Sequence, residues 1–273
     1  MTQPVISLNQ ATTLGHSFEE DLLWLSDGPY AGLGVMRSKL EDYGVERFAQ
    51  WVQRTETRVT SLNWIGGFTD REPGDFDRAI EDALQAIGDA SSIGAETVTV
   101  ITGGTNMHIY RQAFRMVCDA LATLAPTAQQ LGVSLGLEVM HPGCGPNWSF
   151  LQNLKQAIDV VEQVAHPAVG LTADLYHLGL MSDTASWLSE AAKHVRLVQI
   201  GDGRLTPNGE MNRCPIGSGR IDLSSLMRLL LEADYCGPIE VELLGEDVEI
   251  FDKGDLLQHS HEKTTALLDI CSR

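Results

Sequence analysis

Hydrophobic and polar residues alternate most clearly at residues 133–142 (VSLGLEVMHP), where they predict a buried strand. Every second residue from Val133 to Val139 is aliphatic, whereas the positions between them are small until Glu138. A buried carboxylate without a partner is costly or gives up its charge. We therefore expect a polar or charged group to face Glu138 at the end of this strand.

The same alternation recurs in three later runs, each with a polar residue near its end. These runs are residues 169–174 (VGLTAD) with Asp174, 195–200 (VRLVQI) with Gln199, and 237–244 (GPIEVELL) with Glu242. Parallel strands of a barrel all end at one rim. The pattern therefore predicts that four rim residues converge there: Glu138, Asp174, Gln199 and Glu242. Glu240 lies one layer deeper than Glu242 and is expected to pair inside the barrel.

The rest of the chain alternates short strand-like runs with runs of helical period. Four further strands are expected at residues 4–8, 30–36, 58–68 and 97–101. Helices are expected at residues 17–25, 40–55, 75–92, 107–131, 150–165, 184–194, 223–233 and 256–271. This order favours parallel strands with right-handed crossovers, so we predict a (β/α)8 TIM barrel, a single domain over residues 1–273. A doubly wound sheet is the alternative, disfavoured because no GxGxxG follows the first strand.

Composition narrows the class of protein. The chain has 273 residues, of which 43% are hydrophobic and 21% charged, as in ordinary globular enzymes. Its formal charge of −18 opposes nucleic acid and anionic membranes as partners and favours a small neutral substrate. The five cysteines lack a CxxC pair and are interpreted as free thiols. Neither a membrane-spanning run nor a signal peptide is visible, so a cytoplasmic protein is expected, and a homo-oligomer is left open.

Three carboxylates at one rim require a compensating charge. At a separation of roughly 5 Å, each pair repels by about 3 kcal/mol at an effective dielectric constant of about 20. A divalent cation held by the four rim residues is the simplest solution. The alternative is that one acid is protonated and the others pair with Arg37, Arg204 or Arg213. Carboxylate and amide oxygens are hard donors, so Mg²⁺ or Mn²⁺ is expected before Zn²⁺.

Two histidines follow these acids at a fixed spacing. His141 and His177 each lie three residues beyond a rim acid, in EVMH and DLYH. On a loop that leaves a strand, this offset lets the ring turn back over the rim, within reach for general acid–base catalysis. The alternative for each is a structural hydrogen bond.

Further candidates for substrate contact lie on the predicted loops. Arg213 offers a fork of five donors to substrate hydroxyls or a carboxylate, unless it pairs with a surface acid. Asp202 could orient Arg213 or a ligand. Trp64, together with Phe68 and Trp148, is expected either to form an apolar wall against a sugar ring or simply to pack the loops.

The chain resembles the sugar phosphate isomerase/epimerase superfamily of xylose-isomerase-like barrels. The matching segments are LEVMHP, ADLYHLG, LVQIGDG, NRCPIGSGRIDL and GPIEVEL, with SLNQATT and VTSLNWIGGF nearer the N-terminus. The resemblance covers nearly the whole chain. It implies a divalent ion, often Mn²⁺, on the four rim residues, with His177 and Arg213 as substrate contacts. Position 199 departs from the family pattern, because Gln199 stands where His is usual.

These features together suggest a metal-dependent isomerase or epimerase of a small sugar or cyclitol carbonyl compound. Glu138 or Glu242 would remove the proton next to the carbonyl, and the opposite acid would return it through a cis-enediolate. His177 would steady an oxygen, and His141 is a second candidate base. A dehydratase or lyase of inosose, dehydroshikimate or C-glycoside-opening type would begin with the same step. The alternative from another class is a non-catalytic or partner-dependent barrel whose metal site is weakened by Gln199.

Overall fold

Eight parallel strands close into a barrel, as the alternating pattern predicts. The computed structural model describes residues 4–72, 74–145 and 147–271. Each strand pairs with the next in sequence, and β8 pairs with β1 to close the ring. The strands are β1 (Ile6–Asn9), β2 (Gly32–Met36), β3 (Arg58–Gly66), β4 (Ala95–Ile101), β5 (Ser134–Glu138), β6 (Val169–Asp174), β7 (Val195–Ile200) and β8 (Ile239–Val241). The fold is therefore a (β/α)8 TIM barrel.

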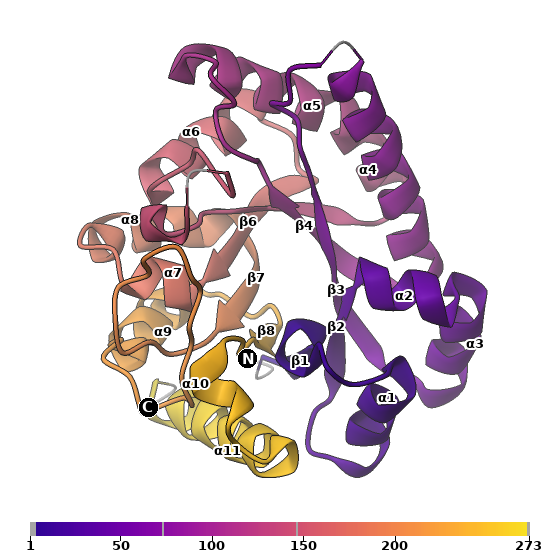
Figure 1. The fold of residues 1–273 in the computed structure, drawn as a ribbon, viewed down its shortest axis with the longest axis vertical. Coiled ribbons are helices and arrows are strands. Elements are labelled where there is room, and N and C mark those ends of the chain that lie inside the picture. Colours follow the sequence, from indigo (N-terminus) through magenta and orange to yellow (C-terminus); the bar gives the residue numbers. More distant parts are fainter. Residues whose placement is uncertain (1–3, 73, 146, 272–273) are drawn as a thin grey trace.

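Helices connect the strands and surround them (Figure 1). They are α1 (Phe18–Asp27), α2 (Arg37–Tyr43), α3 (Val45–Thr55), α4 (Asp75–Ser92), α5 (Tyr110–Gln130), α6 (Leu154–Val164), α7 (Leu175–Gly179), α8 (Thr184–Ala191), α9 (Leu223–Glu232), α10 (Glu246–Glu249) and α11 (Lys253–Cys271). Short 3-10 turns are η1 (Gln10–Thr13), η2 (Pro142–Cys144) and η3 (Ala192–His194). Ser17 caps α1 in a capping box with Glu20, which confirms its predicted start.

The single helix expected over residues 40–55 was wrong. The chain forms α2 and α3 instead, because Gly44 between them has a φ of +99°, which a right-handed helix cannot continue. His177 also lies in the short helix α7 rather than on a loop.

Strands β5 and β6 show how the barrel brings the acids to one end. Glu138 pairs in register with Thr172, and Asp174 pairs with Gln199 on β7. Two residues before Glu138 on β5, the strands leave no room for a side chain: a Cβ on Gly136 would lie 2.3 Å from the Thr172 hydroxyl. Only glycine allows the two strands to pack there without displacing Thr172.

Glu240 is a buried carboxylate inside the barrel, where the deeper of the two β8 acids was expected to pair. It accepts hydrogen bonds from Asn9 Nδ2 at 2.7 Å and from the Thr60 hydroxyl at 2.6 Å. Gly34 leaves room for it, since a Cβ there would lie 2.5 Å from the Glu240 carboxylate. Burial raises the pKa of Glu240 to about 7 despite these hydrogen bonds.

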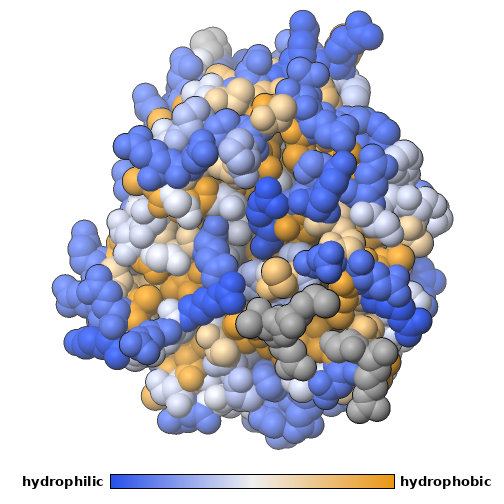
Figure 2. All heavy atoms as spheres, turned by 180° about the vertical axis from the view of Figure 1, so that it is seen from behind, coloured by the Kyte–Doolittle hydropathy of each residue, from blue (hydrophilic) through white to orange (hydrophobic). Residues whose placement is uncertain are grey.

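The outer surface is largely hydrophilic (Figure 2). Figure 2 shows hydrophilic side chains over most of the face opposite that of Figure 1, with hydrophobic ones between them. Within the described ranges, no helix is both long and apolar enough to pass through a bilayer.

The raised pKa of Glu240 predicts a specific pH dependence of stability. Its pKa rises from 4.5 to about 7 on folding, so its contribution is fully present below pH 4.5 and is lost as pH rises through 7. Glu240→Gln removes this titration. From pH 4 to pH 8, the difference in unfolding free energy between variant and wild type should therefore change by about 3 kcal/mol in favour of the variant. Urea denaturation at each pH measures this difference.

The control for this comparison is Glu41→Gln, at an exposed position of α2. Its free-energy difference from wild type should stay constant with pH, within about 0.5 kcal/mol. A constant difference for Glu240→Gln as well would show that Glu240 is ionised as easily in the folded as in the unfolded chain.

Candidate active site

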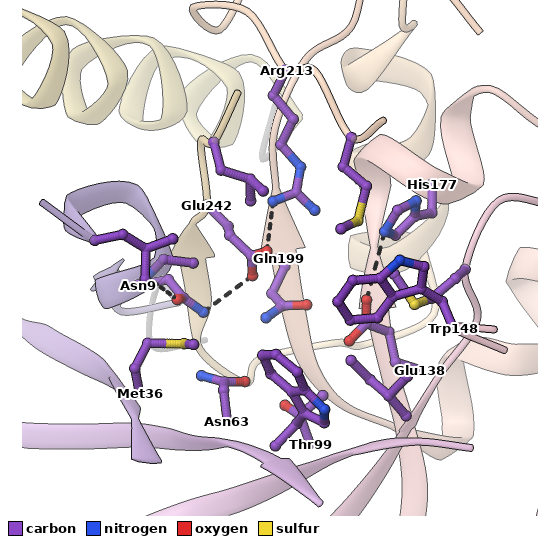
Figure 3. Close-up of a pocket in the computed structure, with 17 residues that line it drawn as sticks. Asn9, Met36, Asn63, Thr99, Glu138, Trp148, His177, Gln199, Arg213 and Glu242 are labelled. Atoms are coloured by element: carbon purple, nitrogen blue, oxygen red, sulfur yellow. Dashed lines mark hydrogen bonds and ion pairs between the residues drawn. The ribbon is translucent and has the colours of Figure 1, made fainter. Parts of the chain in front are cut away.

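A cavity of about 290 Å³ opens at the carboxyl ends of the strands. Glu138, Gln199 and Glu242 line it, as predicted for the rim (Figure 3). Asp174 lies directly behind them, 1% exposed, and its Oδ2 is 3.5 Å from Nε2 of His177. The structure therefore brings all four predicted rim residues to one place, three in the wall of the cavity and one behind it.

Arg213 holds two of the acids together. Its guanidinium, 1% exposed, forms ion pairs with Asp174 and with Glu242, the latter at 2.5 Å between Nη1 and Oε1. The face of Tyr176 packs against the same guanidinium, with 4.8 Å from Cζ to the ring centroid. Two of the three acids therefore have the arginine pairing that was expected as the alternative to a divalent cation.

The other arginines considered for this role lie elsewhere. Arg37 pairs with Asp82, and Arg204 pairs with Asp247 at 3.2 Å. Glu138 has no arginine partner among the described residues and keeps only His177, with 3.7 Å between Oε1 and Nε2.

His177 is a buried ring between a thiol and two acids. Its Nδ1 lies 3.6 Å from the Cys144 sulfur, and its Nε2 faces Glu138 and Asp174. Burial lowers the pKa of His177 well below its ordinary value, with Arg213 adding to the effect. The imidazole is therefore neutral near pH 7, and Nε2 is available to a ligand in the cavity.

Burial and mutual repulsion shift the acids upward. Burial raises the pKa of Glu138 well above its ordinary value, and the Asp174 and Glu242 carboxylates raise it further. Burial also raises the pKa of Asp174 and Glu242, but Arg213 opposes the change in both. Burial alone would lower the pKa of Arg213, yet these two acids raise it above its ordinary value. Arg213 thus opposes the upward pKa shift most directly at the two acids that it contacts, Asp174 and Glu242.

The donor set fits a divalent cation. Oxygen or nitrogen atoms of Glu138, Asp174 and His177 lie within 4.8 Å of one another. Oε1 of Gln199 and Nε2 of His177 are buried without a hydrogen-bond partner in the described part of the chain. Buried polar atoms without a partner are costly unless a ligand satisfies them. An ion among these atoms would neutralise the Glu138 carboxylate and bind the unpaired Oε1 of Gln199.

The remaining predicted residues divide between the cavity and the loops. Trp64 and Trp148 line the cavity, with ring centroids 5.8 Å apart, whereas Phe68 is fully buried outside the lining. His141 is also outside the lining, and its Nδ1 accepts a hydrogen bond from the Gly143 N–H at 2.9 Å. Asp202 is buried away from the cavity as well.

Asp202 serves the loop that carries Arg213. Its carboxylate accepts hydrogen bonds from the backbone N–H groups of Gly203, Gly217, Gly219 and Ile221. Its own backbone carbonyl accepts from the N–H of Cys214, the residue after Arg213. Asp202 therefore fixes the path of this loop, and it can orient Arg213 only through the backbone.

Two residues of the site were not recognised from the sequence. Asn9, at the end of β1, donates Nδ2 hydrogen bonds to Glu240 at 2.7 Å and to Glu242 at 3.1 Å, and so links the two layers. The sequence does offer a signal for Asn9, which directly follows the strand expected at residues 4–8. Cys144, interpreted only as a free thiol, contacts His177 because the fold brings the 3-10 turn η2 against helix α7, which no spacing in the sequence indicates.

Known proteins show where this architecture recurs. A family model described as xylose isomerase-like TIM barrel matches residues 23–267. A ketose 3-epimerase of Arthrobacter globiformis is 28% identical over 130 residues, 47% of this chain and 41% of that protein. A 3-dehydroshikimate dehydratase of Pseudomonas putida is 25% identical over 48% of this chain and 21% of its own. An L-ribulose-5-phosphate 3-epimerase of Escherichia coli is 24% identical over 51% of this chain and 45% of that protein. The chain spans less than half the length of each of these relatives.

Solved structures share the fold over nearly the whole chain. A protein of Sinorhizobium meliloti superposes with a TM-score of 0.89 at 25% identity, over 96% of this chain and 98% of that one. The IOLI protein, solved with a zinc atom, gives a TM-score of 0.86 at 22% identity, over 97% and 98%. An L-ribulose 3-epimerase gives 0.82 at 18% identity, over 99% and 96%.

Removal of the Arg213 guanidinium should destabilise the fold. Arg213→Met leaves Asp174 and Glu242 without their positively charged partner, which costs on the order of 3–5 kcal/mol. The measurement is urea unfolding of protein stripped of metal, with Arg204→Met as the control. The Arg204 pair is half exposed, so its loss should cost about 1 kcal/mol or less. Equal costs for the two variants would contradict a structural role of the Arg213 pairs.

Proposed function

Because the chain belongs to the xylose isomerase-like TIM barrel family, we propose that it is a divalent-metal-dependent isomerase or epimerase of a small sugar or cyclitol carbonyl compound. One observation supports this most directly. Glu138 and Glu242 line a single cavity and Asp174 lies behind it, with a neutral histidine and a buried arginine beside these acids. The sugar epimerases among its relatives are consistent with the same chemistry.

The proposed ion is Mn²⁺ or Mg²⁺, held by the four rim residues. Their hard oxygen donors suit these ions. When bound, the ion would polarise a substrate carbonyl and its neighbouring hydroxyl, which makes the adjacent C–H more acidic. Metal binding would also require Arg213 to share Asp174 and Glu242 with the ion.

Glu138 and Glu242 are the proposed acid–base pair. They enter the cavity from β5 and from the end of β8, so a substrate between them would present opposite faces to the two carboxyl groups (Figure 3). One ionised carboxylate takes the proton from the carbon next to the carbonyl, and the other carboxyl group returns a proton to the product carbon through a cis-enediolate. Return on the opposite face gives an epimer, whereas return to the neighbouring carbon gives an isomer.

The neighbouring side chains prepare these acids for proton transfer. Asn9 and Arg213 hold Glu242 from two sides, which fixes the direction of its carboxylate. His177 is neutral, so its Nε2 can hydrogen-bond a substrate oxygen without adding charge. Arg213 pairs with two acids through Nη1 and Nη2, and its Nε has no hydrogen-bond partner in the described part of the chain, so we propose that Nε contacts a substrate hydroxyl.

A dehydratase or lyase is the second candidate. The 3-dehydroshikimate dehydratase among the relatives favours it, and removal of a proton next to a carbonyl is also the first step of such an elimination. The two reactions differ in whether a hydroxyl leaves from the next carbon. A non-catalytic or partner-dependent barrel remains the alternative if Gln199 prevents metal binding.

Metal analysis tests the site. Protein purified without chelator should carry close to one Mn²⁺ or Mg²⁺ per chain by mass spectrometry of the elements. Glu242→Gln should lose most of it, because an amide replaces an ionised ligand. The control Glu249→Gln, at an exposed position of α10, should keep its metal. Metal content and turnover that both survive in Glu242→Gln would rule out the proposed site.

Hydrogen exchange tests the reaction. Ketoses, inososes and 3-keto-glycosides incubated in D₂O with the metal-loaded protein should take up deuterium next to the carbonyl in at least one case. Glu138→Gln should slow that exchange by about 10²–10⁴-fold, the usual contribution of a general acid or base. Mass spectrometry also separates the candidates, since a loss of 18 Da marks dehydration. Metal-loaded protein that exchanges none of these compounds would argue against enediolate chemistry.

A further inference from the structure

One side of the cavity has no role in the proposed proton transfer. The eight strands form a closed ring, so β4 lies across the barrel from β8, and β3 lies across from β7. The four proposed metal ligands belong to the consecutive strands β5, β6 and β7 and to the end of β8. Among the described lining residues, the strands β2, β3 and β4 contribute Met36, Asn63, Trp64, Thr99 and Ile101. None of these five side chains carries a charge.

Thr99 brings an unpaired hydroxyl to this side of the cavity. The residue lines the cavity, is 1% exposed, and its Oγ1 has no hydrogen-bond partner in the described part of the chain. A buried hydroxyl is costly unless a partner completes it, and valine would fill the same space without that cost. Thr102, one residue beyond β4, has such partners, since its hydroxyl donates to the Gly103 carbonyl at 2.9 Å and lies 3.1 Å from the Ser149 hydroxyl. Packing alone therefore does not account for a threonine at position 99.

Asn63 supplies a hydrogen-bond acceptor beside Thr99. Asn63 and Thr99 each follow the registered pair Leu62–Val98 of β3 and β4, and both line the cavity (Figure 3). Asn63 is 5% exposed, and its Nδ2 donates to Ser61 Oγ at 2.8 Å and to a carbonyl of β2 at 3.4 Å. Both amide hydrogens are used in this way, so Oδ1 is the atom of Asn63 that remains for a ligand.

Together these two groups match a neutral hydroxyl. A hydroxyl both donates and accepts hydrogen bonds, whereas an amide oxygen only accepts. A substrate O–H can therefore give its hydrogen to Asn63 Oδ1 and accept one from the Thr99 hydroxyl. A carboxylate or phosphate oxygen has no hydrogen for the amide oxygen and would find no cationic side chain from β2, β3 or β4 in the described lining. An ammonium group would likewise find no carboxylate from these strands.

We propose that Thr99 and Asn63 form a specificity subsite that binds one hydroxyl of the substrate, on a carbon remote from the carbonyl. This assignment rests on the proposed function, which holds the carbonyl end against the acids on the other side of the barrel. Met36, Trp64 and Ile101 around the subsite offer surfaces that suit C–H groups. Recognition from this side is therefore directed at a single hydroxyl.

Deoxy ligands test the subsite without involving turnover. D-Fructose, D-psicose, D-tagatose and D-sorbose share a carbonyl at C2 and differ in the orientation of their hydroxyls. The one that binds the metal-loaded protein most tightly by isothermal titration calorimetry is compared with its own 4-, 5- and 6-deoxy analogues. Thr99→Val should weaken binding of the parent ketose and of two analogues by about 5-fold or more. The third analogue lacks the matched hydroxyl, so its binding should change by about 2-fold or less.

Matched variants separate a ligand subsite from a structural hydroxyl. Thr99→Val removes an unpaired atom, so the ligand-free variant should melt at the wild-type temperature or above it. The control Thr102→Val removes a paired hydroxyl outside the cavity, and it should melt at a lower temperature but bind every ligand within about 2-fold of wild type. Thr99→Ser keeps the hydroxyl and should retain most of the affinity for the parent ketose.

Four results would overturn the proposal. They are wild-type protein that binds none of the four ketoses, Thr99→Val that binds every ligand as wild type does, Thr99→Val that weakens all the ligands alike, and a lower melting temperature of ligand-free Thr99→Val. The exchange experiment remains a separate test. Discrimination by Thr99 without deuterium uptake by any keto compound would keep the subsite and remove the proposed reaction. Uptake with ligand binding unchanged in Thr99→Val would do the reverse.

Discussion

The buried guanidinium of Arg213 is the interaction on which the site depends. Asp174 and Glu242 come from different strands, and each would repel the other and Glu138 at short range in a buried site. Arg213 neutralises this repulsion for two of the three acids, and Tyr176 holds its planar face in place. The loop that carries Arg213 is in turn fixed by Asp202, which gathers four backbone N–H groups. Hydrogen bonds of Asp202, outside the cavity, therefore hold the loop that places the Arg213 guanidinium beside the acids.

Repetition of one local pattern places the acids. Each strand alternates large aliphatic residues against the helices with small or polar residues inside the barrel, so polar groups at equivalent positions meet when the ring closes. Small residues are as necessary as the acids, since Gly34 and Gly136 leave the space that Glu240 and Thr172 fill. The barrel thus stacks its inward polar groups in layers, with Asn9 as a bridge between two of them.

The sequence predicted what depends on strand periodicity and failed where long-range contacts decide. The strands, the barrel and the convergence of the rim residues follow from period-two alternation, because a one-residue slip would invert every side chain. Loops have no such period. The anchoring of Asp202 and the contact between Cys144 and His177 therefore appeared only in the structure. The break at Gly44 was missed because helical spacing continues across it, while its left-handed φ is invisible in the pattern.

Burial and charge are physically coupled in the cavity. Burial of the Glu138 carboxyl group is the main reason why its pKa is raised. A ligand that fills the cavity would displace water and strengthen the charge interactions around it. Glu138 lies beside the neutral imidazole of His177, whereas Glu242 lies beside the guanidinium of Arg213. The surroundings of the two acids therefore differ before any ligand binds, because only Glu242 has an opposite charge in direct contact.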